Sequence, residues 1–347
     1  MLRPLALVLA ALTVTLTLLP LSRSKRWWVR LWDFPRAQVG ALALVALALW
    51  LAAARGAPPD AGAVRGWGAL VTAALGAVVL FQGAHVWRYS PLAPREVQRA
   101  QRPGPGHTLT IVESNVLQTN REAERLLAVT RAADADVYLF VETDPWWQAR
   151  LDALERTHPH TLKCALDNTY GMLLYSRLPL EEPSVDFLVQ PDIPSMHAKV
   201  RLKDGRRVWL NCVHPRPPAP GESDESLERD AELVVVGRRV AASRLPVVVM
   251  GDLNDVAWSR TTRLFQKVSR LLDPRKGRGF LATFHARWPG LRWPLDHLFH
   301  SDDFRVVEMR RLPYVGSDHF PVYVCLSHEP DAAVEQEAPV PDAGDLE

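Results

Sequence analysis

Three long apolar runs near the N-terminus constrain this chain more than any other feature of its sequence. Each run lacks Asp, Glu, Lys and Arg, and together they cover about residues 4–21, 38–54 and 67–87. Each approaches the ~20 residues that a helix needs to cross a bilayer. Tryptophans, which are common at membrane interfaces, lie at or near run ends: Trp50, Trp67 and Trp87. The sequence therefore predicts a membrane domain of three transmembrane helices over residues 1–89.

Two other interpretations of the apolar runs are weaker. The first run could be a signal peptide, but only SRSKRWW (22–28) follows it, without an A-x-A-like cleavage site, and two more apolar runs come next. The runs could also be buried helices of a soluble protein. Three such runs in succession, separated by charged residues, are hard to bury in that way.

The rest of the chain divides by composition into three parts. Residues 90–106 are rich in proline, glycine and charge, and we expect a linker. Residues 329–347 hold seven acids and no base, and we expect a disordered tail. The domain between them, at 107–328, is close to neutral. Proteins that grip nucleic acid nonspecifically usually show a basic excess on the binding domain, so its charge does not favour such a partner.

The central domain alternates strand-like and helix-like segments. Strands are expected at 108–117, 136–142, 170–176, 196–202, 207–214, 246–254, 295–300, 304–312 and 319–327. Helices are expected at 121–133, 144–157, 223–243 and 259–272, with Asp144 as an N-cap. Asp204-Gly205 indicates a hairpin. Many hairpins among helices favour an α/β fold with layered mixed sheets over a Rossmann sheet.

Acids, amides and histidines stand at the ends of several of these strands. They are Asn115, Glu142, His214, Asp252, Asn254, Asp296, His297, Asp318 and His319. A buried charge is costly unless it is paired. Carboxylates that converge from several strands at one sheet edge make a site for a hard cation with room for an anion.

Three nearby features are expected to be structural. Asp255 is interpreted as a cap of the helix at 258–272, and His297 as a core residue. The segment DPRKGRGF (273–280) could touch a phosphate, but a solvated loop is the favoured interpretation.

Six short motifs, taken in order, resemble the endonuclease/exonuclease/phosphatase superfamily over about 220 residues. They are ESNV, LFVET, NCVHPRPP, VVMGDLN, LDHLF and GSDHFPV. The apolar runs ahead of them resemble a bacterial membrane-anchored branch of that superfamily. The resemblance implies a DNase I-like fold, a four-layer α/β/β/α sandwich, here preceded by three transmembrane helices.

The resemblance also implies roles for individual residues. Asn115, Glu142 and Asp318 would hold a divalent metal, Mg²⁺ or alternatively Mn²⁺. Asp252 would activate the attacking water, and Asn254 would orient the phosphate or water. His214 and His319 would contact the phosphate, and Asp296 would fix the tautomer of His319. Phosphoester hydrolysis needs these parts: an in-line water, charge neutralisation and a stabilised leaving group.

We therefore expect a membrane-anchored phosphoesterase that acts on a phosphodiester or pyrophosphate, lipid-linked or close to the bilayer. The alternatives are a tethered nuclease of the same chemistry and a noncatalytic adaptor. The expected location is the bacterial inner membrane. Basic loops favour a cytoplasmic central domain, whereas the family resemblance favours the extracytoplasmic side, towards which we lean.

Overall fold

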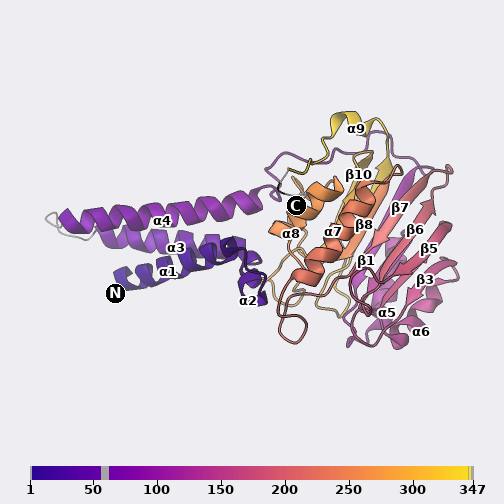
Figure 1. Ribbon diagram of the computed structural model, residues 1–347, viewed down its shortest axis with the longest axis horizontal. Helices are drawn as coiled ribbons and strands as arrows, with labels where there is room; N and C mark the ends of the chain where they lie inside the picture. The colour runs from indigo at the N-terminus through magenta and orange to yellow at the C-terminus, as the bar shows by residue number, and fades with distance from the viewer. Residues whose placement is uncertain (1, 56–61, 343, 345–347) are drawn as a thin grey trace. The chain divides into compact units, whose positions relative to one another are not determined.

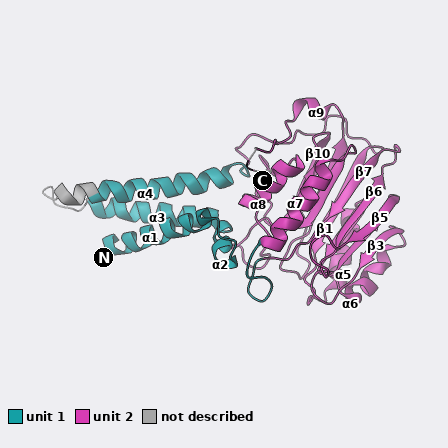
Figure 2. Ribbon diagram, viewed as in Figure 1, with its two compact units in different colours: residues 1–90, 218–226 teal, residues 91–217, 227–347 magenta. Residues whose placement is uncertain are grey.

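The computed structural model describes residues 2–55, 62–342 and 344 (Figure 1). The chain forms two compact units (Figure 2). We call residues 1–90 with 218–226 the helical unit, and residues 91–217 with 227–347 the sheet unit.

Three helices of the helical unit are long and apolar enough to cross a membrane. They are α1 (Leu2–Leu18), α3 (Arg36–Arg55) and α4 (Gly62–Trp87). Short helices lie between α1 and α3: η1 (Leu19–Ser22), α2 (Trp27–Arg30) and η2 (Leu31–Asp33). The long helices pack through small and aliphatic side chains that include Ala10, Ala43, Ala46 and Leu75. Small residues are typical of helix contacts in membranes because they let the backbones approach closely.

A buried polar network also links the three long helices. Gln82 on α4 accepts a hydrogen bond from the Arg36 Nη1 on α3 (3.2 Å) and donates one to the Thr17 Oγ1 on α1 (2.8 Å). Arg36 is further paired with Asp33. These contacts bring the end of α1, the start of α3 and the C-terminal part of α4 together, so α1 and α3 run in opposite directions, as do α3 and α4.

Residues 218–226 belong to the helical unit although they lie between two parts of the sheet unit in sequence. The Trp27 N–H donates to the Asp224 carbonyl (3.0 Å), and the Ser226 N–H donates to the Lys25 carbonyl (2.9 Å). The chain therefore leaves the sheet unit after residue 217 and returns to it at residue 227.

The sheet unit contains two mixed sheets. The first has the strand order β10-β11-β1-β2-β4-β3, and the second β5-β6-β7-β8-β9. The strands of the first sheet are β1 (Thr108–Asn115), β2 (Val137–Val141), β3 (His160–Cys164), β4 (Met172–Ser176), β10 (Phe304–Arg311) and β11 (Val322–His328). Those of the second are β5 (Leu180–Asp186), β6 (Ser195–Arg201), β7 (Arg207–Cys212), β8 (Val247–Asp252) and β9 (Asp296–His300).

Helices cover the outer faces of both sheets. The helices of the sheet unit are α5 (Ala123–Ala133), α6 (Pro145–Leu151), η3 (Asp152–Leu154), α7 (Leu227–Ala241), α8 (Arg260–Ser269) and α9 (Ala332–Glu335). α5 and α6 share a core with the outer side chains of the first sheet, and α7 and α8 with those of the second. A third core lies between the sheets. This α/β/β/α arrangement confirms the expected four-layer fold.

Alternation along the strands assigns each side chain to a layer. On β1, Leu109 and Ile111 belong to the core between the sheets, whereas Val112 belongs to the outer core with α5. The expected helix start at Asp144 is confirmed, because its side chain accepts a hydrogen bond from the Trp147 N–H (2.8 Å). The hairpin at Asp204-Gly205 is also present, and Gly205 adopts the left-handed conformation (φ +88°) that favours glycine.

Two segments that we expected to be irregular are partly packed against the sheet unit. In the expected linker, Val97 is fully buried and Glu96 pairs with Lys276 (2.7 Å). In the expected disordered tail, Glu329 is buried beside Arg305, and Gln336 donates to the Phe304 carbonyl (2.9 Å). Residues 343 and 345–347 of that tail lie outside the described residues.

Candidate active site

Asn115 and Glu142 lie at the ends of the parallel strands β1 and β2. Asn115 is opposite Val141 in the register, so Glu142, the next residue, lies beside it. The Asn115 Nδ2 donates to the Glu142 Oε1 (2.6 Å) and to the Asp252 Oδ2 (3.1 Å). Asn115 thus bridges the carboxylates of two different sheets. Burial raises the pKa of Glu142, although Asn115 and His319 act in the opposite direction.

Asp252 and Asp296 face each other on the second sheet, where β8 ends and β9 begins. The antiparallel register pairs the two residues directly. The Asp252 Oδ1 accepts from the Asn254 N–H (2.8 Å), and Asn254 has a left-handed backbone (φ +52°). Burial raises the pKa of Asp252 to about 7, although His319 lowers it. The strand therefore ends in a carboxylate that is aimed into a site and is not a helix cap.

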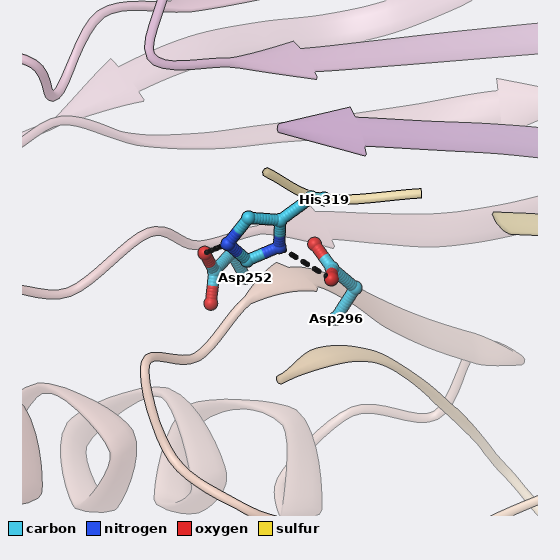
Figure 3. A group of neighbouring side chains, drawn as sticks. All are labelled: Asp252, Asp296 and His319. Carbon is cyan, nitrogen blue, oxygen red and sulfur yellow. Dashed lines mark hydrogen bonds and ion pairs between the residues drawn. The ribbon is translucent and has the colours of Figure 1, made fainter. Parts of the chain in front are cut away.

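His319 lies between the two aspartates (Figure 3). Its Nδ1 is 2.7 Å from the Asp296 Oδ2, and its Nε2 is 3.6 Å from the Asp252 Oδ2. Burial disfavours the imidazolium, but Asp296 and Asp252 outweigh burial and raise the pKa of His319 to about 10. At neutral pH the ring is therefore a cation, and its Nδ1–H donates to the Asp296 carboxylate.

The remaining expected site residues lie nearby without direct side-chain bonds to this group. His214 is buried beside the Tyr170 ring (centroids 5.5 Å apart), and burial lowers its pKa to about 3, so it is neutral. Asp318 is half-buried, and its charge raises the pKa of both Glu142 and His319. The Asn254 side chain donates to the Pro215 carbonyl (3.0 Å).

Sequence reasoning missed two residues that support the group. Ser317 donates from its Oγ to the Asn115 carbonyl (2.8 Å) and accepts from the His319 N–H (3.0 Å). Glu113 is buried between the sheets, and burial followed by Asp296 and Asp252 raises its pKa. Side chains alternate between the two faces of a strand, so Glu113 lies on the same inner face of β1 as the core residues Leu109 and Ile111. An acidic residue on that inner face was the sequence signal that could have indicated its role.

The donor set fits a divalent cation. Asp252, Asp296 and His319 offer ligand atoms that all lie within 4.8 Å of one another, so they form one group that could hold a metal ion. However, both ring nitrogens of His319 already face carboxylates, and a metal ion there would compete with the imidazolium. Glu142 and Asp318 add carboxylate oxygens near this group, and the charge of Asp318 is among the causes that raise the pKa of Glu142, after burial. The Asn115 Oδ1 accepts from the Leu117 N–H (2.9 Å). Oxygen ligands of this kind are the ones that Mg²⁺ prefers.

His297, Asp255 and the segment 273–280, which we expected to be structural, have structural contacts, but two of the three expectations need correction. His297 is a buried core residue, with its Nε2 2.8 Å from the Asp255 carbonyl oxygen. Asp255 does not cap α8; Ser259 does, and its hydroxyl donates to the Asp255 Oδ2 (2.7 Å). The 273–280 segment is not a solvated loop, because Arg275 is fully buried against Asp273 (2.8 Å).

We predict that Arg275→Met lowers the free energy of unfolding by about 3–5 kcal/mol, because it leaves the Asp273 carboxylate buried without its partner. Urea unfolding of the detergent-solubilised protein measures this loss. Arg125→Met is the matched control, since Arg125 and Glu122 form an exposed pair. Exposed pairs contribute about 0–1 kcal/mol. Equal losses in the two variants would contradict a structural role for the buried pair.

Comparison with known proteins adds a family and a fold. Residues 112–319 match the model of the Endonuclease/Exonuclease/phosphatase family. A humanized TDP2 of D. rerio has a TM-score of 0.54 and 16% identity, over 63% of this chain and 99% of that one. D. rerio TDP2 complexed with single strand DNA product scores 0.53 at 16% identity, with the same coverage. An endonuclease/exonuclease/phosphatase from Beutenbergia cavernae scores 0.53 at 20% identity, over 64% and 72%. No curated protein matches the chain.

Proposed function

This chain belongs to the endonuclease/exonuclease/phosphatase family, and from that membership we propose that it is a membrane-anchored, divalent-metal-dependent phosphoesterase. Its substrate would be a phosphodiester or pyrophosphate that is lipid-linked or close to the bilayer. The observation that carries the proposal is the contact group of Asn115, Glu142, Asp252, Asp296 and His319, which four strands and the segment before β11 bring together.

The residues of this group suit the steps of phosphoester hydrolysis. Asp252, with a pKa of about 7, is suited to accept a proton from the attacking water near neutral pH. The imidazolium of His319 would donate to the phosphoryl oxygens as negative charge develops on them. Asp296 would keep the ring oriented. His214 and Asn254 would contact the phosphate from the β7 and β8 side.

Glu142, Asn115 and Asp318 would hold the metal ion, with Mg²⁺ favoured over Mn²⁺. A bound divalent cation supplies charge neutralisation at the phosphoryl and leaving-group oxygens. Glu142 would be the principal ligand, because both oxygens of its carboxylate are oriented, one by the Asn115 Nδ2 (2.6 Å) and the other by the Gln118 N–H (3.3 Å). Cation binding would also favour the ionised form of Glu142, which burial alone disfavours.

We predict that saturating Mg²⁺ raises the Tm of the full chain by about 5–10 °C, and that Glu142→Gln removes most of this shift. Ligand at 100 times its Kd adds about 2.7 kcal/mol of stability, and 1 kcal/mol moves Tm by about 2–4 °C in a domain of this size. The measurement is thermal unfolding with Mg²⁺ or EDTA. Glu232→Gln is the matched control, because burial likewise raises the pKa of Glu232, to about 7, and Glu232 is not one of the expected site residues. If Glu142→Gln kept the full Mg²⁺-dependent rise in Tm, Glu142 would not be a ligand of the metal.

Two features support a substrate close to the bilayer. The helical unit has three helices that could span a membrane. Only residues 88–95 separate the end of α4 from Glu96, which is already packed in the sheet unit. Three crossings would place the N-terminus and the residues after α4 on opposite sides. We propose the bacterial inner membrane, with the sheet unit extracytoplasmic; an alkaline phosphatase fused to the C-terminus would be active in that orientation and inactive in the reverse one.

A tethered nuclease is the second candidate, because a structural neighbour, D. rerio TDP2, has been crystallised with a single strand DNA product. The charge of residues 103–328, with 29 basic and 29 acidic residues, disfavours it.

The deciding experiment measures phosphate release and strand cleavage by the detergent-solubilised full chain with Mg²⁺. The substrates are a polyprenyl pyrophosphate, a phospholipid panel and supercoiled plasmid, and Asp252→Ala/His319→Ala is the inactive control. Release from a lipid that depends on both residues supports the proposal. Plasmid nicking alone would make the protein a nuclease, and inactivity on all substrates would favour the adaptor.

A further inference from the structure

A hairpin beside His319 presents large apolar side chains to solvent. The Phe284 N–H donates to the Trp293 carbonyl (3.0 Å), and the Trp293 N–H donates back to Phe284. Residues 287–291 form the exposed tip. At this tip Trp288 is 61% exposed and Leu291 is 48% exposed. Isolated exposed apolar residues are common, but a tryptophan and a leucine exposed together on one tip point to a contact surface.

The hairpin is attached directly to the catalytic group. The Phe284 ring packs on the His319 ring, with centroids 5.0 Å apart. The Ala286 N–H donates to the Asp318 carbonyl (2.6 Å). The tip is therefore positioned by the same segment that carries Asp318 and His319, and whatever it contacts lies close to the phosphate site.

Three arginines lie on the hairpin or beside it: Arg287, Arg292 and Arg311. Arg287 donates to the Tyr314 hydroxyl (3.0 Å) and to the Gly316 carbonyl (2.8 Å). Arg292 and Arg311 stack on the same ring, that of Phe320, at 5.1 and 4.2 Å, and their hydrogen bonds go to backbone carbonyls.

In the part of the chain that the structure describes, no carboxylate forms an ion pair with any of the three arginines. Burial and then the neighbouring Arg292 lower the pKa of Arg311, as expected for like charges held together. The segment 280–295 likewise contains two arginines and no acid. Among the described residues, the positive charge on and beside the hairpin is therefore not neutralised by a carboxylate ion pair.

We propose that the hairpin 284–293 docks on a bilayer that contains anionic lipids, with Trp288 and Leu291 inserted at the interface and the three arginines against lipid phosphates. Tryptophan favours the headgroup level of a bilayer. Each basic side chain near an anionic surface adds to the attraction. This docking would present the catalytic group to the membrane surface. It therefore deepens the proposed function and rests on it.

A nucleic acid could also attract arginines and stack on a tryptophan. A bilayer fits better because Leu291 offers no ring for stacking and because the same chain carries three helices that could span a membrane.

The test is spin-label depth measurement on the full chain in nanodiscs of phosphatidylcholine with phosphatidylglycerol. Leu291→Cys and Lys203→Cys, each in a Cys164→Ser background, carry the label at the tip and at an exposed position of another hairpin. We expect the label at 291 to lie about 5–10 Å into the headgroup and acyl boundary, shielded from a water-soluble nickel complex and accessible to oxygen. The label at 203 should remain accessible to nickel.

Arg292→Gln/Arg311→Gln should reduce the shielding at 291, and more so when phosphatidylglycerol is present than in phosphatidylcholine alone. A tip label as accessible to nickel as the control would overturn the proposal, as would shielding that appears only when a single-stranded oligonucleotide is added. The insertion depth of the spin label does not depend on catalytic turnover of a substrate. Shielding without any phosphoesterase activity would thus support the docking surface and reject the proposed function, whereas activity without shielding would do the reverse.

Discussion

Asp252→Asn is expected to lower kcat by about 10²–10⁴-fold, the contribution typical of a positioned general base. Asparagine keeps the shape of the side chain and can still accept from the Asn254 N–H, but it cannot take a proton from water. The cost to the folded state should be small, because two effects oppose each other. The amide oxygen cannot accept from both the Asn254 N–H and the Asn115 Nδ2, so one hydrogen bond is lost, but a buried charge is removed as well. Burial raises the pKa of Asp252 from the ordinary 3.8 to about 7, so this carboxyl lowers the stability of the metal-free fold as pH rises between these two values, and the neutral amide removes this cost. Steady-state kinetics and thermal unfolding of the same preparations measure both effects.

Asp255→Asn is the matched control for Asp252→Asn and should show the opposite pattern. Asp255 is equally buried in the same loop, but it pairs with the buried Arg229 (3.0 Å) and accepts from the Ser259 hydroxyl. Its loss should lower Tm clearly, while the folded protein keeps its kcat. If Asp252→Asn lost stability and retained its turnover, Asp252 would be a structural residue and the proposed base would have to be sought elsewhere.

Asp296→Asn should also lower kcat by about 10²–10⁴-fold, and should in addition shift the pH dependence of turnover. Asp296 is the first of the groups that raise the pKa of His319 to about 10 against the effect of burial. Without this carboxylate the imidazolium loses its proton at lower pH. The alkaline limb of the kcat/KM profile, which we expect near pH 10 in the parent protein, should therefore move towards neutral pH.

Asp303→Asn provides the control for this shift. Asp303 and His328 form another aspartate–histidine pair in the sheet unit (3.2 Å), at the ends of β9 and β11 opposite to those that carry Asp296 and His319. This variant should keep the kcat and the pH profile of the parent protein. An unchanged alkaline limb in Asp296→Asn would show that His319 is not the group whose deprotonation limits the rate.

The sequence was informative where a local pattern determines the structure. Apolar runs indicated the long helices, and polar residues at strand ends indicated the side chains that the sheets bring together. The edge strands β3 and β5 were missed, because β5 contains Glu181, Glu182 and Pro183 in place of an alternating apolar pattern. Edge strands tolerate such residues since one side of the strand needs no partner.

Other features depend on contacts between residues distant in sequence, which local patterns do not reveal. The segment 273–280 looked like a basic surface loop, but Arg275 contacts Asp273, and also His297 across the fold (2.7 Å). The expected linker contains Glu96, and nothing near it in sequence indicates that Lys276 is its partner. The expected roles of individual site residues came from family resemblance, because spacing alone could not tell which of the strand-end residues meet.

The short connection between α4 and Glu96 has a consequence for kinetics. Residues 88–95 can extend by roughly 30 Å at most. If α4 crosses a bilayer, the sheet unit samples only a thin shell along that surface, where a membrane-borne substrate is present at a high effective concentration. Encounters would then follow lateral diffusion in two dimensions. The rate should scale with the mole fraction of substrate in the membrane, and diluting the vesicles at constant composition should leave it unchanged.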